Sequence, residues 1–481
     1  MPLTPARYGQ SSCLLQSILI QSRAQSLSLP RVRPLNTASV PSGQTVGATK
    51  FEPPDRDGHL AEVKSKHMPL SILPLGNLIR SFAITSLSSY PAVLKFALRT
   101  LSHIANSQSV ILDPDRNPVL HFFLRKTFYD HFCAGETPDE VHSTLRRLKD
   151  IGFSGVMLAY GKEIVLDKGE SAASLTRVEE PPATDKPDPD VQEWKQGALK
   201  TVELTEHGDF AALKITGAGK ETMRHLIENR SNPSKEMDTA LTEICELAKG
   251  RGVGLLFDAE QSCVQKGIDA WTLVFQKRFN KEKAVVYNTY QAYLHSMPTV
   301  LRDHLQDAQQ HDYVLGIKLV RGAYLASDPK DIFCASKAST DENFDKVADS
   351  LLQRSWNSAL KSSGELNSFP RVDLVLATHN RESVRKALRI QEQHHREDKQ
   401  PGPLVLGQLM GMADEISCDL VLASRRAGAQ DYGPRAYQYL VWGSVRDCLK
   451  YLIRRAEENR DAAIRAIDTR IALKGEIMRR L

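Results

Sequence analysis

Short apolar runs alternate with segments of helical periodicity along most of the chain. Apolar runs bounded by Gly, Pro or polar residues are typical of buried parallel strands, and the segments between them repeat at helical spacing. The expected strands occupy residues 155–161, 211–217, 254–260, 284–294, 313–324, 372–380, 404–410 and 436–443. Eight such units favour an α/β fold of the closed (β/α)8 type over an open doubly wound sheet.

The segment before the first run contains a strong helix start. Thr137 supplies an N-cap, Pro138 suits the first helical position, and Glu140 lies at the capping-box position. Val141, Leu145 and Leu148 then recur at helical spacing up to Gly152. We therefore expect the barrel to occupy residues 137–465, preceded by a helical arm (51–136) and followed by a helical tail (466–481). Residues 164–195, rich in Glu, Asp, Pro and Ser, are expected to form a polar insertion.

The basic excess of the chain lies in its first 50 residues. The net charge is +5, from 63 basic and 58 acidic residues, and residues 1–50 contain five basic residues and no acidic one. The remaining chain is neutral, which argues against a nucleic-acid-binding face. A Ser-rich, Arg-bearing, acid-free leader is typical of a mitochondrial transit peptide, and a disordered tail is the alternative.

Composition narrows the class of protein further. Apolar residues make up 41% and charged residues 25% of the chain, as in globular proteins. No run approaches the about 18 apolar residues that a membrane-spanning helix needs. The seven cysteines form no Cys-x-x-Cys pair, so neither a disulfide framework nor a thiolate metal site is expected.

The barrel prediction locates the active site at the carboxyl ends of the strands. Polar residues gather at those expected ends, although each one singly is also compatible with a solvated rim position. Charges are seldom buried without partners or a ligand, so their coincidence is the signal. These residues are Lys214, Asp258, Glu260, Gln291, Lys318, Arg321, Tyr324, Thr378, His379, Asn380, Gln408 and Tyr439.

Familiar nucleotide and hydrolase motifs are absent from the sequence. The segment 217–222 (GAGKET) lacks the first glycine of a phosphate loop, since Lys214 stands at that position. No GxGxxG follows an expected strand, and neither HExxH nor GxSxG occurs. A Rossmann dinucleotide domain is therefore not expected.

The ordered motifs GLLFDAE, NTYQAY, GIKLVRGAY, ATHN, QLMGM and YLIRRAEEN resemble proline dehydrogenase in its eukaryotic mitochondrial branch. The resemblance runs from about Thr137 to about Arg460. It implies a distorted (β/α)8 barrel that binds FAD without a Rossmann domain. It further implies oxidation of L-proline to 1-pyrroline-5-carboxylate, with electrons passed to ubiquinone on the matrix side of the mitochondrial inner membrane.

The resemblance also assigns roles to individual residues. Where bacterial relatives read Arg-Leu-Val-Lys, this chain reads Lys-Leu-Val-Arg at 318–321, and Lys lacks the planar fork of Arg. The residues matched to the proline site are Lys214, Asp258, Leu319, Tyr324, Leu409, Tyr439, Arg454, Arg455 and Glu458. Those matched to flavin contacts are Gln291, Lys318, Val320, Arg321, Thr378 and His379.

Two other classes of function remain open on the residues alone. A barrel lyase or aldolase could form a Schiff base through Lys214 or Lys318, but it leaves the paired arginines Arg454 and Arg455 unexplained. A non-catalytic barrel would not need every motif position filled by a competent group. No residue is assigned as acid or base, and no metal is expected. The oligomeric state is not predicted.

The leader prediction can be tested by truncation. A chain beginning at residue 51 should retain activity in vitro and lose its mitochondrial location in cells, because residues 1–50 carry the basic, acid-free segment and no expected barrel element. Fluorescence microscopy of tagged full-length and truncated chains measures this. Entry of the truncated chain into mitochondria would contradict the assignment.

Overall fold

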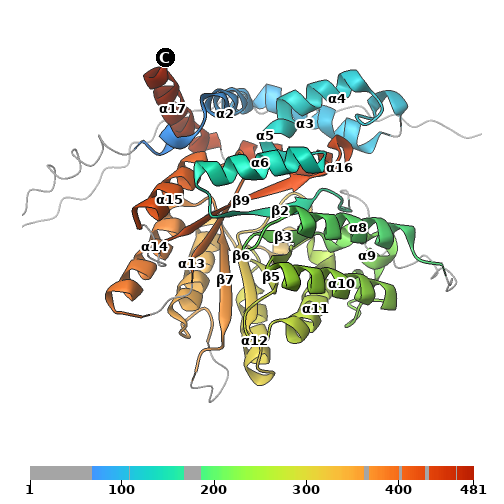
Figure 1. Ribbon diagram of the computed structural model, residues 1–481, viewed down its shortest axis with the longest axis vertical. Coiled ribbons are helices and arrows are strands. Elements are labelled where there is room, and N and C mark those ends of the chain that lie inside the picture. The colour runs from blue at the N-terminus through green and yellow to red at the C-terminus, as the bar shows by residue number, and fades with distance from the viewer. Residues whose placement is uncertain are drawn as a thin grey trace, which may run out of the picture. The chain divides into compact units, whose positions relative to one another are not determined.

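Eight parallel strands, β2 to β9, close into a barrel in this computed structural model (Figure 1). Consecutive strands pair from β2 to β8, and β9 closes the barrel by pairing with both β8 and β2. The structure describes residues 68–107, 109–166, 186–361, 368–399, 403–427, 433–461 and 463–481. The strands are Gly155–Tyr160 (β2), Phe210–Leu213 (β3), Gly254–Phe257 (β4), Val286–Gln291 (β5), Leu315–Val320 (β6), Val372–Ala377 (β7), Val405–Leu409 (β8) and Arg435–Trp442 (β9).

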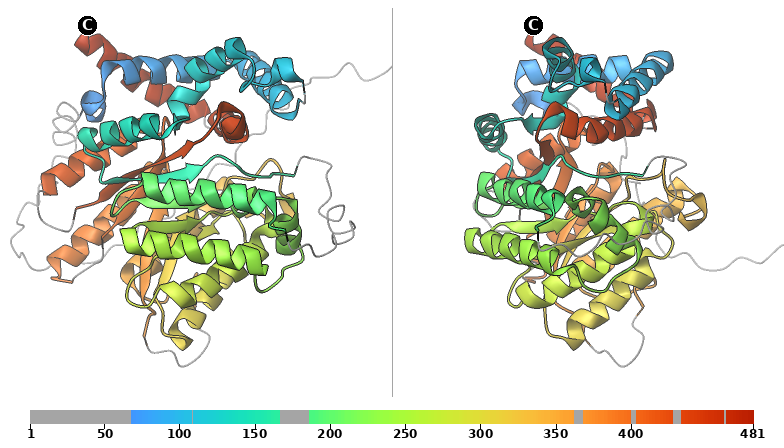
Figure 2. Two further views of the ribbon diagram at one scale, coloured as in Figure 1. Left: turned by 45° about the vertical axis from the view of Figure 1, so that its right-hand side comes forward. Right: turned by 90° about the vertical axis from the view of Figure 1, so that its right-hand side faces the viewer.

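The strands coincide with the eight apolar runs, so the predicted α/β barrel is confirmed. Helices lie between successive strands and cover the outside of the barrel (Figure 2). They are Pro189–Leu204 (α8), Lys220–Ile227 (α9), Lys235–Arg251 (α10), Ser262–Phe279 (α11), Met297–Gln310 (α12), Lys337–Gln353 (α13), Arg381–Arg396 (α14) and Asp414–Ala427 (α15). Two 3-10 turns, Ile215–Ala218 (η4) and Lys330–Ile332 (η5), also lie in these connections.

The helix predicted from the capping signal is α6, Pro138–Ile151. The Thr137 hydroxyl accepts a hydrogen bond from the Glu140 amide, and the helix ends at Gly152, whose φ is +102°. The side chain of Glu140 accepts from the Glu136 amide at 2.9 Å, one residue before the position of an ideal capping box. Local sequence signals thus set both ends of this helix.

A short ninth strand, Cys133–Gly135 (β1), was not anticipated. It pairs with Val441 and Trp442 of β9. The same edge of β9 also pairs with β8, but β8 extends only as far as Tyr439. Three residues are too few to show a period of two, so the pattern carried no signal. The last residues of the expected arm (51–136) are therefore hydrogen-bonded to the barrel.

The region expected as a polar insertion, 164–195, contains the start of α8. The Asp188 side chain caps this helix by accepting from the Asp190 amide, and Val191 and Trp194 are buried. Apolar burial therefore begins before the expected end of the insertion. Residues 167–185 lie outside the described residues, as does the leader 1–50.

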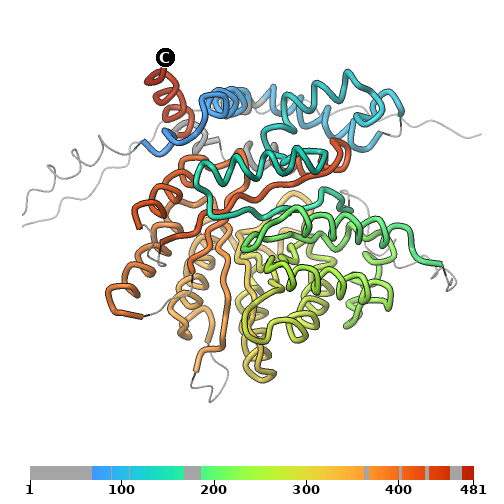
Figure 3. Tube along the Cα trace, viewed as in Figure 1, coloured from blue at the N-terminus to red at the C-terminus, as the bar shows by residue number. Residues whose placement is uncertain are grey.

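Helices from both ends of the described chain form a layer beside β9 (Figure 1). The chain trace shows the first and last helices, α2 and α17, side by side (Figure 3). Arg480 of α17 donates to the carbonyls of Leu70, Ser71 and Leu73. The elements are Pro69–Ile72 (η1), Leu75–Ser88 (α2), Pro91–Asn106 (α3), Val110–Leu112 (η2), Pro118–Leu124 (α4), Arg125–Tyr129 (η3), Asp130–Phe132 (α5), Val445–Asp461 (α16) and Ala463–Arg480 (α17).

Aromatic rings fill the barrel interior near the amino ends of the strands. The ring centroid of Phe210 lies 5.5 Å from that of Tyr287 and 5.4 Å from that of Tyr437, both in edge-on geometry. These edge-on contacts join the first residues of three strands inside the barrel. Within the described ranges, no helix is long and apolar enough to cross a membrane.

Asn280 supports two strands from inside the fold. Its side chain is fully buried, accepts from the amides of Val285 and Val286, and donates to the carbonyls of Val286 and Val314. We predict that Asn280→Ala lowers the free energy of unfolding by at least about 3 kcal/mol, because several buried backbone groups lose their partner. Thermal and chemical denaturation measure the loss.

Gln393→Ala is the matched control for Asn280→Ala. Gln393 bonds Glu397 on the exposed side of α14, so its loss should cost less than about 0.5 kcal/mol. Equal stability of the two variants would contradict the role of Asn280.

Candidate functional site

A buried carboxylate, Asp258, lies just beyond β4 at the carboxyl end of the barrel. One of its oxygens lies 2.5 Å from Lys318 Nζ. Its other oxygen accepts from the Tyr439 hydroxyl at 2.6 Å and lies 3.3 Å from Lys214 Nζ. The contacts come from β6, β9 and the residue after β3, so the closed barrel brings together positions far apart in the chain.

The two lysines keep Asp258 ionised. Burial opposes its charge, but Lys318 and Lys214 outweigh that penalty and lower the pKa of Asp258 to about 2. Burial also lowers the pKa of Lys318, against the attraction of Asp258. The pKa of Lys214 is raised, because Tyr324, Asp258 and Glu163 together outweigh its burial. Lys214 is therefore a cation at neutral pH.

A second ion pair joins α16 to the connection after β2. Arg454 of α16 contacts both carboxylate oxygens of Glu163, and both side chains are largely buried. Burial opposes ionisation of Glu163, yet Arg454 and Lys214 hold its pKa below the ordinary value. The Arg454 guanidinium also lies 5.3 Å from the centre of the Tyr324 ring. Because Tyr324 follows β6, these contacts place α16 across the carboxyl end of the barrel.

Tyr324 lies between two cations. The Lys214 ammonium is 6.0 Å from the centre of its ring, on which Arg454 also packs. Gly322, with a φ of +133°, permits the turn that carries Tyr324, because a Cβ there would lie 1.5 Å from the Tyr293 ring. The buried Tyr324 hydroxyl has no hydrogen-bond partner in the described part of the chain. A buried polar group without a partner marks a place where a ligand can bind.

Glu260 is a buried carboxyl near this group. Its side chain accepts hydrogen bonds from the amide and the hydroxyl of Thr216. Burial raises the pKa of Glu260 to about 7, although Lys214 and Thr216 oppose the shift. Its protonation therefore changes near neutral pH.

Most of the residues matched to flavin contacts lie at the ends of three neighbouring strands, β5, β6 and β7. Arg321 donates to Asp341, Thr378 and Ser383 at 2.6, 2.6 and 2.8 Å. Gln291 ends β5 and donates to the Glu260 carbonyl at 3.3 Å. Val320 ends β6. These residues form one sector of the barrel mouth.

His379 and Lys318 hold this sector to the rest of the mouth. His379 follows β7, and its Nε2 accepts from the Leu409 amide at 3.0 Å. Lys318 lies 2.5 Å from Asp258, and its ammonium is 4.7 Å from the centre of the Tyr439 ring. Lys318, which the resemblance matches to a flavin contact, therefore contacts Asp258 and Tyr439, which it matches to the proline site.

Leu319 does not join that group, which corrects its expected place in the wall around the proline ring. Side chains alternate along a strand, so Leu319 faces away from Lys318. It packs with Leu315 and Ile317 in the layer between strands and helices. Leu409 ends β8 and packs against the interior cluster that contains Tyr439.

The paired arginines of α16 differ in their surroundings. Arg454 meets Glu163, whereas Arg455 is buried and its guanidinium lies 4.9 Å from the centre of the Tyr451 ring. The side chain of Glu458, expected to orient the arginines, lies outside the described residues.

Glu163 was missed by the sequence analysis. It stands three residues after the last residue of β2. A charged residue at or shortly after the end of a strand is the signal that found Lys214 and Asp258. The polar composition of the adjoining segment concealed this signal.

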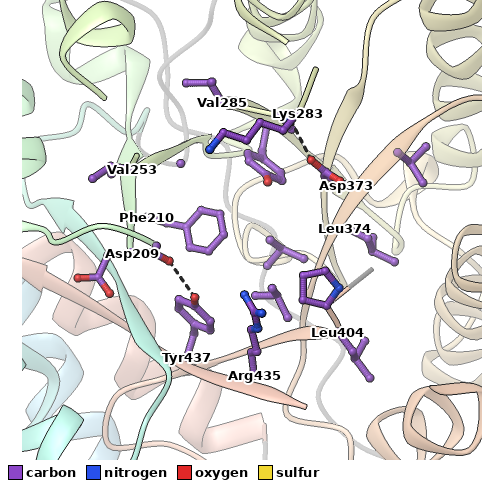
Figure 4. Close-up of a pocket in the computed structure, with 18 of the residues that line it drawn as sticks. Asp209, Phe210, Val253, Lys283, Val285, Asp373, Leu374, Leu404, Arg435 and Tyr437 are labelled. Carbon is purple, nitrogen blue, oxygen red and sulfur yellow. Dashed lines mark hydrogen bonds between the residues drawn. The ribbon is translucent and has the colours of Figure 1, made fainter. Parts of the chain in front are cut away.

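A cavity of about 360 Å³ opens at the opposite, amino end of the barrel (Figure 4). Phe210, Tyr437, Lys283 and Arg435 are among the residues that line it. Residues at this end of a (β/α)8 barrel usually serve stability. We therefore take the charged group at the carboxyl end as the candidate site.

No cluster of His, Cys, Asp and Glu among the described residues could hold a metal ion, and the six described cysteines are free. The donors in the sector of β5 to β7, an arginine, a hydroxyl, an amide and an imidazole, suit a group that carries carbonyl, ring-nitrogen and phosphate acceptors. These donors fit a flavin.

Comparison with known proteins agrees with this chemistry. A family model described as proline dehydrogenase matches residues 141–466. The chain is 28% identical to a probable mitochondrial proline dehydrogenase of Schizosaccharomyces pombe, over 75% of this chain and 80% of that protein. It is 27% identical to mitochondrial proline dehydrogenase 1 of Arabidopsis thaliana, over 93% of each chain.

A solved structure supports the fold. Proline utilization A of Bdellovibrio bacteriovorus aligns with a TM-score of 0.56 and 17% identity, over 79% of this chain and 38% of that chain. The family match covers more than half of the 481 residues. The chain belongs to the proline dehydrogenase family.

Proposed function

We propose that this chain oxidises L-proline to 1-pyrroline-5-carboxylate with a bound FAD as hydride acceptor. The observation that carries the proposal is the charge of the site. Lys214, Lys318 and Arg454 face two carboxylates, Asp258 and Glu163, whose pKa values lie below their ordinary range. The three cations exceed the two carboxylates by one charge, and the substrate carboxylate would balance that charge.

Arg454 and Lys214 are the groups suited to hold that carboxylate. Arg presents a planar fork that fits a carboxylate through two hydrogen bonds, and Arg454 already makes this arrangement with Glu163. The substrate would share or displace Glu163. Tyr324, which contacts both cations, and Tyr439 would flank the ring, and Arg455 would add positive charge from the same helix.

Asp258 would position neighbouring side chains rather than contact the substrate itself. It holds the ammonium of Lys318 and the hydroxyl of Tyr439. Rigid placement of this kind lowers the barrier to reaction, because the reacting carbon and its acceptor are held together.

Gln291, Val320, Arg321, Thr378 and His379 are the residues proposed to hold the FAD. When bound there, the flavin supplies the acceptor for a hydride from the proline carbon next to nitrogen. Loss of that hydride and of one proton from nitrogen leaves the C=N bond of the product. Glu260 is positioned near the cluster with a pKa of about 7, so it can take up a proton near neutral pH.

A Schiff-base lyase is not favoured. Such an enzyme needs a neutral lysine amine that is open to the substrate. Lys214 has a raised pKa, and Lys318, although burial lowers its pKa, is bonded to Asp258. It also leaves the buried Arg454–Glu163 pair without a role.

The relatives from S. pombe and A. thaliana are named mitochondrial, and the leader has the composition of a transit peptide. We therefore propose a mitochondrial location on the matrix side of the inner membrane, with ubiquinone as the electron acceptor.

The visible absorption spectrum tests the function. Purified protein should be yellow, with flavin bands that bleach when proline is added without oxygen. Extraction and chromatography identify the flavin as FAD. A colourless, folded protein that binds no FAD would overturn the proposal.

Arg454→Met is expected to lower kcat/KM for proline by roughly 30- to 1000-fold, or about 2–4 kcal/mol of transition-state stabilisation. Because the substitution leaves Glu163 buried and unpaired, stability should also fall. Adding Glu163→Gln should recover stability without recovering kcat/KM. Steady-state kinetics and melting temperatures measure the two effects.

Arg446→Met is the matched control on the same helix. Arg446 pairs with Asp113 near the surface, away from the site. If Arg454→Met and Arg446→Met had equal kcat/KM values, Arg454 would not bind substrate.

Glu260→Gln is expected to change how stability depends on pH. With a folded pKa of about 7 against an ordinary 4.5, Glu260 makes the folded state bind more protons than the unfolded state. Its contribution is therefore complete below pH about 4.5 and is lost as pH rises through about 7, on the order of 3 kcal/mol in all. Gln stays neutral, so the variant should gain stability relative to wild type between pH 5 and 8.

Melting temperatures of wild type and Glu260→Gln at about pH 5 and about pH 8 measure the effect. Glu246→Gln, which changes an exposed residue of α10, is the control. A constant difference between wild type and Glu260→Gln would contradict the buried, neutral carboxyl.

A further inference from the structure

The amino end of this barrel differs from the usual (β/α)8 pattern, in which inward side chains fill the interior in layers. In this chain it holds the cavity of about 360 Å³ drawn in Figure 4. That volume lies within the range of about 300–1,000 Å³ that is typical of pockets for small molecules. The candidate site at the carboxyl end makes no use of this cavity.

The inward positions at the amino ends of the strands explain why the cavity is open. Side chains alternate along a strand, so the residue two positions before an inward residue also faces inward. Inward residues in the middle of five strands are Met157, Leu256, Lys318, Val375 and Tyr437. The residues two positions earlier are Gly155, Gly254, Gly316, Asp373 and Arg435. Three glycines and two charged residues thus stand where apolar side chains would fill the barrel.

Two of the glycines let aromatic rings lie directly against the strand backbone. A Cβ at Gly155 would lie 2.5 Å from the Tyr437 ring, and a Cβ at Gly254 would lie 2.5 Å from the Phe210 ring. The Tyr437 hydroxyl donates to the Gly208 carbonyl at 2.8 Å, which fixes its ring in place. Together with Tyr287, these rings give the cavity an aromatic wall.

The charged residues that line the cavity are mostly basic. Figure 4 shows the Arg435 side chain beside the Tyr437 ring and pointing into the cavity. The basic residues in the lining are Lys249, Lys283, Arg354 and Arg435, and the acidic ones are Asp209 and Asp373.

Both acidic side chains have other partners. Asp209 lies 3.1 Å from Lys149 Nζ, outside the cavity lining, and accepts from the Val156 amide at 3.0 Å. Asp373 accepts from the Ala284 amide at 2.8 Å. The basic residues therefore dominate the charge that a ligand in the cavity would meet.

We propose that this cavity binds a small organic anion with a flat aromatic body. The aromatic body packs on Phe210 and Tyr437, whose rings offer apolar area and stacking faces. The acidic group of the ligand, a carboxylate, sulfonate or phosphate, meets Arg435. A guanidinium suits this role because two of its N–H groups can donate to one acidic group.

Buried apolar side chains separate this cavity from the candidate site. Met157, Leu256 and Val375 are buried, and they belong to the interior cluster that also contains Tyr439. A ligand in the cavity would therefore not contact the residues proposed to bind proline or FAD. The proposal does not rest on the proposed function.

Isothermal titration calorimetry of the full, flavin-loaded chain tests the proposal with two matched probes. Naphthalene-1-sulfonate carries the acidic group, and 1-naphthalenemethanol has the same rings without a charge. Wild type should bind one naphthalene-1-sulfonate per chain, at least about tenfold more tightly than the neutral probe, because only the anion bonds Arg435.

The variant Arg435→Met keeps most of the side-chain volume and removes the charge. It should bind naphthalene-1-sulfonate at least about tenfold more weakly and 1-naphthalenemethanol as wild type does. Arg371→Met is the matched control, because Arg371 precedes β7 at the same end of the barrel but pairs with Asp312 at 2.7 Å, outside the cavity lining. Arg371→Met and Arg454→Met should bind both probes as wild type does.

The variant Val405→Phe tests the cavity without a change of charge. Val405 is buried, faces inward and lines the cavity, so a larger ring there takes up the open volume. Both probes should bind at least about tenfold more weakly, and the melting temperature should not fall, because the added ring enters open space. This variant keeps the test decisive if Arg435→Met does not fold.

A crystal structure of the protein soaked in naphthalene-1-sulfonate locates the probe. We expect its rings on Phe210 and Tyr437 and its sulfonate at Arg435. The proposal would be overturned if wild type bound no probe, if the probe lay at the carboxyl end of the barrel, or if Val405→Phe bound it like wild type. Equal losses in Arg435→Met and Arg371→Met, or in Arg435→Met and Arg454→Met, would also contradict it.

Discussion

The buried Asp258 carboxylate imposes a charge balance on the whole mouth of the barrel. A carboxylate that is 4% exposed stays ionised only beside cations. Lys318 within β6 and Lys214 just after β3 satisfy that need. Tyr439 completes its hydrogen bonding from β9. Each of these buried charges is stable only because groups of opposite charge or hydrogen-bond donors lie beside it.

Helix α16 is the second element on which the site depends. It differs from the other connecting helices because its residues reach across the carboxyl ends of the strands, where Arg454 meets Glu163 and Tyr324. Helices α3 and η3 support it from outside, and Tyr129 donates to the Gly443 carbonyl just before it begins. The helical arm is therefore part of the framework of the site.

The same packing explains the apolar residues on the inner face of the arm. Its inner face contributes to the cluster around Leu449 and Leu452 of α16, and its outer face remains exposed.

The pattern of apolar residues by itself determined the eight strands, the α6 helix and the end of the barrel at which polar residues gather, because strand and helix periods and caps are local properties. It did not reveal β1, which has three residues, or the role of Glu163, whose partner lies 291 positions away. The position of Leu319 outside the site also follows from strand alternation, which matching of motifs ignores. Only the closed barrel decided which charges meet, since the Asp258 pairs and the Arg454–Glu163 pair join residues from separate elements, and burial there sets their pKa values.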